Sequence, residues 1–279
     1  MADLPIDLPD PELAGRLAGA LDVEGKILRA LEALGPIAGR DVVLVNGDGG
    51  LRARQLVSLG ARLTVLERPD RLDLIDGLGV ALADLPGVTV AAGEPGSTGL
   101  AAASADAVVS YWSAYRGPDP VEIAEAERIL RPGGRLLILH DYGRDDVSRL
   151  FSPERPEYTT WSHRRGPFLV GGFKIRVIHC FWTFDSIEEA SALLRDGFGE
   201  PGAALAATLG RPRLSYNVAI YHRTRSEPDA EPDAASAAAP GAKPGAEPDA
   251  EPDAAPGAEP DAEPDAEPGA EPDAEPAAR

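Results

Sequence analysis

Cysteine and histidine are scarce in this chain of 279 residues. Cys180 is the only cysteine and there are four histidines. A single thiol excludes a disulfide within the chain and a site of several thiolates, and it suits a reducing compartment. His179 and His222 have no acidic residues at metal-ligand spacing, so we expect both to be structural. The sequence therefore predicts no metal site.

Long apolar runs are also missing. None approaches the roughly 20 residues that a helix needs to cross a bilayer. The first residues, MADLPIDLPDPELAGRL, carry acids and prolines where a secretory signal has a basic start and an apolar centre. We therefore expect a cytoplasmic protein with no membrane contact.

Large apolar side chains disappear after about Ser226, where EPDA and PGA units take over. Such a segment cannot offset the entropy of ordering its backbone, so we expect residues 226–279 to be a disordered acidic tail. Sixteen acidic and two basic residues fall there, so the tail holds most of the net charge of −19. This charge suits a basic partner and argues against nucleic acid as substrate, unless the tail shields a basic surface.

The body of the chain reads as N-terminal helices over 1–40 and one α/β domain over 41–225. Helical spacing covers Pro11 to Leu34, with a possible break near Gly25. Short apolar runs alternate with helical stretches, which predicts a Rossmann-like three-layer sandwich around a mostly parallel sheet. The seven expected strands are 42–45, 62–66, 88–92, 107–111, 135–139, and one each in GGFKIRVIHCFWTF and LSYNVAIYHR. The expected later helices are 51–59, a short stretch at 71–75, one after Asp119, and 186–194, with an irregular segment over 144–167.

Asp119 and Pro120 predict the start of the helix after the fourth strand. Asp119 is a good N-cap, Pro120 suits the first helical position, and Glu122 stands three residues after the cap. This spacing predicts a capping box, in which the Glu122 side chain returns to the Asp119 backbone.

A glycine-rich turn follows the first strand in VVLVNGDGGLRARQLVSLGARLTVLERPD, residues 42–70. Glycines there let the backbone approach a ligand at the carboxyl edge of the sheet, and Glu67, at the end of the second strand, can accept from ribose hydroxyls. The pattern is typical of an adenosine site, although a plain strand-to-helix turn and a solvated glutamate would look alike. A dinucleotide is less suited than S-adenosylmethionine, because Arg52 stands where the third glycine would fall.

Later segments of the sequence help to distinguish between these two cofactors. Gly93 and Glu94 after the third strand, DAVVSYW in the fourth, and ERILRPGGRLLILHDYG resemble class I S-adenosylmethionine-dependent methyltransferases. The resemblance spans Val42 to Tyr142, and LRPGGRLLI is its most specific part. It departs from the family at Val45, where an acid is common, and at Leu51, where a third glycine is common.

The resemblance implies a role for each residue of the motifs. Glu67 would hold the ribose and Glu94 would accept from the adenine amino group. Ser110 and Tyr111, with Trp112, would flank the cofactor and the substrate entrance. The residues implied at the methionine end are Asn46, Gly47, Asp48, Gly49 and Gly50, of which Asn46 or Asp48 would replace the missing acid.

Methyl transfer from a sulfonium needs mainly alignment, and a base if the acceptor is a hydroxyl. His140 is the first candidate base, with Tyr142 beside it and His163 in the irregular segment. The acceptor would be a small molecule or a protein side chain. Two alternatives stay open: a catalytically silent binding module, favoured by Val45 and Leu51, and a nicotinamide-dependent reductase.

Deleting the residues after Arg225 tests the tail. We expect the melting temperature and cofactor affinity to stay unchanged, because the tail has no large apolar side chains to contribute to a core. Differential scanning calorimetry of the full and shortened chains is the measurement. A large fall in melting temperature would contradict the assignment of the tail as an appendage.

Overall fold

The computed structural model describes residues 3–6, 8–151 and 153–226, and the expected acidic tail lies outside the described residues from 227 onward. One sheet of seven strands has the order β3-β2-β1-β4-β5-β7-β6. All neighbouring pairs are parallel except those that β7 makes with β5 and β6. The strands are β1 (Asp41–Val45), β2 (Arg62–Glu67), β3 (Val88–Ala92), β4 (Ala105–Tyr111), β5 (Leu130–Asp141), β6 (Lys174–Thr183) and β7 (Arg213–Thr224). The expected mostly parallel seven-stranded sheet is confirmed.

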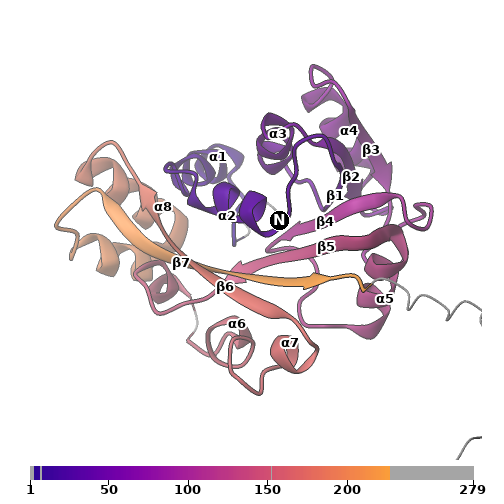
Figure 1. The fold of residues 1–279 in the computed structure, drawn as a ribbon. Coiled ribbons are helices and arrows are strands. Elements are labelled where there is room, and N and C mark those ends of the chain that lie inside the picture. The colour runs from indigo at the N-terminus through magenta and orange to yellow at the C-terminus, as the bar shows by residue number, and fades with distance from the viewer. Residues whose placement is uncertain (1–2, 7, 152, 227–279) are drawn as a thin grey trace, which may run out of the picture. The chain divides into compact units, whose positions relative to one another are not determined.

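Helices cover both faces of this sheet (Figure 1), so the fold has three layers. Side chains of α1 to α4 and α8 share one buried apolar cluster with one face, and those of α5 and α7 share another with the opposite face. No helix of the described chain has the length and apolar character that crossing a bilayer requires. The helices are α1 (Pro11–Ala20), α2 (Lys26–Leu34), α3 (Leu51–Ser58), α4 (Leu72–Ala81), α5 (Pro120–Ile129), η1 (Val147–Leu150), α6 (Pro156–Thr159), α7 (Pro167–Val170) and α8 (Ile187–Ala206).

Several elements are longer than their sequence patterns suggest. α4 continues to Ala81 through two glycines because Leu78 is buried in the core. β5 begins at Leu130, ahead of the RPGG turn that was expected to precede it. α8 continues past a kink at Gly199, whose φ is +58°. For α4, tertiary packing extends the helix beyond the residues with favourable local propensity.

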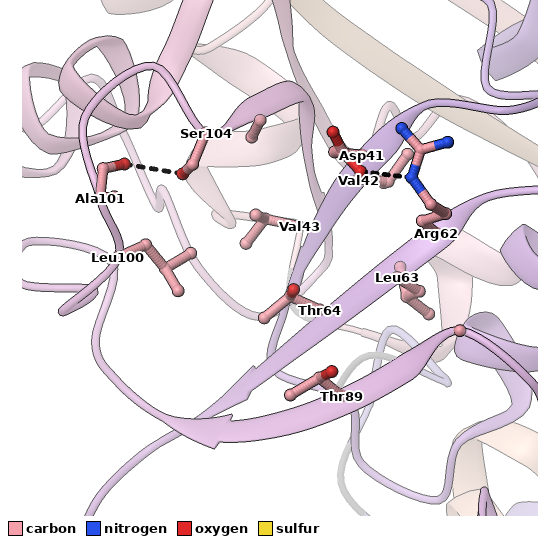
Figure 2. A pocket seen from close by; sticks show the side chains of 12 residues that line it. Asp41, Val42, Val43, Arg62, Leu63, Thr64, Thr89, Leu100, Ala101 and Ser104 are labelled. Atoms are coloured by element: carbon pink, nitrogen blue, oxygen red, sulfur yellow. Dashed lines mark hydrogen bonds and ion pairs between the residues drawn. The ribbon is translucent and has the colours of Figure 1, made fainter.

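The connection from β3 to β4, residues 93–104, contains no helix. It leaves a groove of about 320 Å³ near the amino ends of β1, β2 and β3, with Val43, Thr64 and Thr89 on its floor (Figure 2). Ligands of parallel α/β sheets sit beyond the carboxyl ends of the strands instead. This groove is therefore not the expected cofactor site.

In the turn after β1, position 47 has room only for glycine. A Cβ atom there would lie 2.4 Å from Cγ1 of Val65 and 3.0 Å from Cδ1 of Leu78. Both neighbours are buried in the core, so neither side chain has room to withdraw. Close packing of α4 and β2 thus requires glycine at this position.

Gly47→Ala should lower the free energy of unfolding by about 1–3 kcal/mol, because the added methyl overpacks the core. Gly77→Ala is a matched control, since nothing lies within 4 Å of its Cβ position on the exposed side of α4. It should raise stability by up to about 1 kcal/mol through helix propensity. Urea titration measures both, and equal effects of the two substitutions would contradict the close packing at Gly47.

Candidate functional site

A crevice of about 390 Å³ lies at the carboxyl edge of the sheet. The strand order reverses between β1 and β4, which is where open α/β sheets bind ligands. Loops after four strands supply the walls, and α5 closes one side. The lining residues are Asn46, Arg68, Glu94, Pro95, Ser113, Ala114, Tyr115, Arg116 and Glu122. Of the residues implied by the family resemblance, Asn46 and Glu94 line this crevice.

Three polar atoms of the crevice residues are buried and have no hydrogen-bond partner in the described chain. They are Oδ1 of Asn46, Oε2 of Glu122 and the hydroxyl of Tyr115. Buried polar atoms without partners are uncommon and costly, and each is an acceptor or can act as one. All three atoms belong to residues that line the same crevice.

Glu122 is a residue of this site that the sequence did not reveal. Asp119 caps α5 by accepting from the N–H groups of Val121 and Glu122, as expected. The backbone N–H of Asp119 donates to Gly117, so the predicted return bond from the Glu122 side chain is not made. Burial raises the pKa of Glu122 and Asp119 adds to the rise, while a hydrogen bond from the Tyr115 backbone opposes it. The capping-box prediction is therefore wrong in its second half, and Oε2 of Glu122 has no partner within the described chain.

Glu67 is the last residue of β2 and is 3% exposed. Its Oε2 accepts from the N–H of Gly47 at 3.0 Å, and its Oε1 accepts from the N–H of Arg68 at 3.2 Å. The carboxylate thus joins the loops after β1 and β2. Each oxygen keeps a lone pair for a second donor, and contact with a ribose stays a prediction.

The glycine turn bends between the crevice and the start of α3. Asn46, Asp48 and Gly50 have left-handed φ values of +62°, +43° and +86°. On the α3 side the turn contacts the N-terminal segment: Oδ2 of Asp3 lies 2.8 Å from the position that a Cβ on Gly49 would take. Leu4 is buried in the same core cluster as α3. This side of the turn is therefore covered by the chain itself.

Arg52, at the place of the missing third glycine, is 2% exposed. Its guanidinium donates to the carbonyl of Asp3 at 2.6 Å and to Oε1 of Gln55 at 2.9 Å. It also lies 5.5 Å and 5.3 Å from the ring centroids of Tyr111 and Trp112. These two aromatic residues, expected beside the cofactor, thus face Arg52 and do not line the crevice.

Ser110 is fully buried at the end of β4. Its Oγ accepts from the N–H of Ala114 at 3.2 Å and so folds the following loop back on the strand. Ser113 continues this loop and donates to the carbonyl of Val45 at 3.3 Å. Ser110 therefore shapes the wall that Ala114 and Tyr115 present to the crevice.

The three candidate bases lie apart from the crevice lining. His140 is 1% exposed; its Nε2 donates to the carbonyl of Tyr115 at 3.1 Å, and Nδ1 has no partner among the residues that the structure describes. Burial lowers the pKa of His140 to about 3. Tyr142 is half-buried beneath the guanidinium of Arg144, and His163 is exposed in the loop before α7. A catalytic role for any of them stays a prediction.

Asp141, next to His140, is the centre of a buried polar cluster. It accepts from the hydroxyls of Tyr216 and Tyr158, the latter at 3.2 Å, and lies 3.6 Å from Nη1 of Arg155. Burial raises the pKa of Asp141 to about 6, against the hydrogen bond from Tyr216 and the charge of Arg155. The cluster ties β5 and β7 to the segment around α6. No group of three or more residues able to hold a metal occurs within the described ranges.

Asp141→Asn should change stability in a pH-dependent way. Burial raises the pKa of Asp141 from its ordinary value of 3.8 to about 6 in the folded state, so the cost in stability grows as the pH rises from about 4 to about 6 and is complete above that. The variant lacks this cost, so its unfolding free energy relative to the wild type should improve by up to about 2–3 kcal/mol between pH 4 and pH 7. Chemical denaturation at both pH values is the measurement. Asp196→Asn, which changes an exposed carboxylate on α8, is the control. A difference that stays constant with pH would contradict the shifted pKa.

No family model matches the chain, and no curated protein matches it. Solved structures match over most of its length. A putative type II methyltransferase from Anaeromyxobacter dehalogenans is 20% identical, with a TM-score of 0.52 over 72% of this chain and 95% of that one. The YcgJ protein from Bacillus subtilis is 14% identical, with a TM-score of 0.51 over 72% of this chain and 98% of that one. Together with the strand order, this likeness shows that the chain has the class I methyltransferase fold.

Proposed function

We propose that the chain is an S-adenosylmethionine-dependent methyltransferase whose carboxyl-edge crevice holds the nucleoside of the cofactor. The observation that carries the proposal is the set of unpartnered acceptors on Asn46, Glu122 and Tyr115 around one crevice. Adenosine offers two ribose hydroxyls and one amino group as donors. The ligand thus brings hydrogen-bond donors to a site whose unpartnered atoms are hydrogen-bond acceptors.

The assignment of contacts follows from where each acceptor lies. Asn46 follows β1 directly, and Glu67 accepts from the N–H of the next residue, Gly47, so we assign these two residues to the ribose hydroxyls. Glu94 follows β3 and Glu122 lies on α5, so the carboxylates from these two elements suit the amino group of adenine. Glu67 and Glu94 keep the roles that the family resemblance implies, whereas Asn46, implied at the methionine end, is proposed here for the ribose. Glu122 is an addition specific to this chain.

When bound, the cofactor supplies a methyl group on a sulfonium that a nucleophile can take without further activation. The task left to the chain is to bind the nucleoside, exclude water and align the acceptor. The acceptor's proton would pass to a base. His140 is buried with a lowered pKa, so it suits this role only if the loop over it moves; Tyr142 and His163 are the other candidates. We propose a small molecule or a protein side chain as the acceptor.

A second candidate function is a binding module without catalysis. Asp3, Leu4 and Arg52 cover the α3 side of the glycine turn, where the methionine part of the cofactor would lie. Val45 and Leu51 also depart from the family motif. A module of this kind would hold a nucleoside in the crevice and transfer no methyl group.

Isothermal titration calorimetry with S-adenosylmethionine and with its demethylated product tests the proposal. We expect dissociation constants in the micromolar range. Glu122→Gln should weaken binding by about tenfold, because one oxygen position becomes an NH₂ that cannot accept from the ligand. Its melting temperature should not fall, since Oε2 has no partner within the described chain and burial of the charged carboxylate is unfavourable.

Glu127→Gln is the matched control, because Glu127 lies on the same helix and pairs with Arg223 outside the crevice. It should leave both affinities unchanged. No heat with either ligand would contradict the proposal, and binding of NAD(P)H in their place would favour the reductase. Binding of adenosine alone would favour the silent module.

A further inference from the structure

The N-terminal turn of α3 binds a carboxylate of the chain itself. Oδ1 of Asp3 accepts from the N–H of Arg52 at 3.3 Å. Gly50, the N-cap residue of α3, has no side chain with which to cap the helix. Asp3 therefore supplies from outside the helix the negative charge that a helix N-terminus favours.

Arg52 gives this place a second feature that points to an anion. A guanidinium that is 2% exposed needs a nearby negative charge, because burial of an unbalanced cation is costly. Its Nε has no hydrogen-bond partner within the described residues, so it keeps a free donor. Burial raises the pKa of Asp3, and the charge of Arg52 opposes that rise. The guanidinium donates to the backbone carbonyl of Asp3, and the carboxylate of Asp3 accepts from the backbone N–H of Arg52, so Asp3 lies against a buried arginine that keeps one unsatisfied donor.

The glycine turn runs from the crevice to the start of α3, where the Asp3 carboxylate lies. Asn46 lines the crevice, and only four residues separate it from Leu51, where α3 begins. A nucleoside in the crevice that continues into an amino acid would therefore send its own carboxylate toward the start of α3. The carboxylate of Asp3 lies at that place.

We infer that Arg52 and the first turn of α3 form a carboxylate subsite, and that Asp3 fills it as an internal competitor of the amino-acid part of the cofactor. The inference rests on the proposed function. Ligands with an α-carboxylate have to displace Asp3, whereas nucleosides without one do not. If Asp3 occupies the subsite more than about 90% of the time, the apparent affinity for a carboxylate ligand is reduced at least about tenfold.

The test compares two ligands that share the thioether nucleoside and differ in the amino acid. Calorimetry on the full chain measures S-adenosylhomocysteine, which has the carboxylate, and 5′-methylthioadenosine, which lacks it. Asp3→Ala should tighten binding of S-adenosylhomocysteine by about tenfold or more and leave methylthioadenosine within about twofold. Asp3→Asn, which keeps the shape and loses the charge, should give a smaller gain of the same sign.

Glu12→Ala is the control for charge, because it removes an exposed carboxylate from the first turn of α1. It should change neither affinity. Unchanged methylthioadenosine binding shows at the same time that a variant is folded. Equal changes for both ligands, no change, or weaker binding of S-adenosylhomocysteine by Asp3→Ala would overturn the inference and leave the proposed function standing. Absence of binding by the wild type and every variant would overturn both.

Discussion

The carboxylate of Glu67 is the interaction on which the carboxyl edge depends. It accepts from the backbone of Gly47 and of Arg68, and so holds the turn after β1 against the end of β2. The turn can approach that closely only because Gly47 has no Cβ to meet Val65. From this fixed point the chain reaches the crevice at Asn46 on one side and the start of α3 on the other.

The two sides of the turn differ in what satisfies their polar groups. On the crevice side, acceptors of Asn46 and Glu122 lack partners in the described chain. On the α3 side, Asp3 and the aromatic rings of Tyr111 and Trp112 surround Arg52. Acceptors that suit a nucleoside on one side, and Asp3 and Arg52 on the side where an amino acid would follow, fit the nucleoside part of the proposed cofactor.

Left-handed backbone conformations concentrate around the same edge. Asn46, Asp48, Trp112 and Tyr115 have positive φ values, and all four belong to the loops after β1 and β4. Each costs about 1–3 kcal/mol for a residue other than glycine, most for the bulky aromatic ones. Such conformations persist only where the surrounding structure fixes them, and here Ser110 and Ser113 tie the loop after β4 to both strands. Packing elsewhere in the domain thus sustains the shape of the crevice.

Local sequence patterns predicted the strands well because each is a short apolar run with a turn residue at its end. β3 was predicted residue for residue, and the start of α5 followed from Asp119 and Pro120. The same patterns missed the second half of α4, where burial of Leu78 outweighs the low helix propensity of its glycines. They also assigned Glu122 to a cap, since spacing alone does not reveal which way a carboxylate on a helix end turns.

By itself, the sequence determined the alternation of strands and helices, the glycine turn and the acids after β2 and β3, because these depend on neighbours along the chain. Only the tertiary structure decided that Glu122 and Tyr115 face the crevice and that Asp3 reaches Arg52 across 49 residues. Contacts of that kind arise from the packing of distant segments, for which no periodicity or capping signal exists in the sequence.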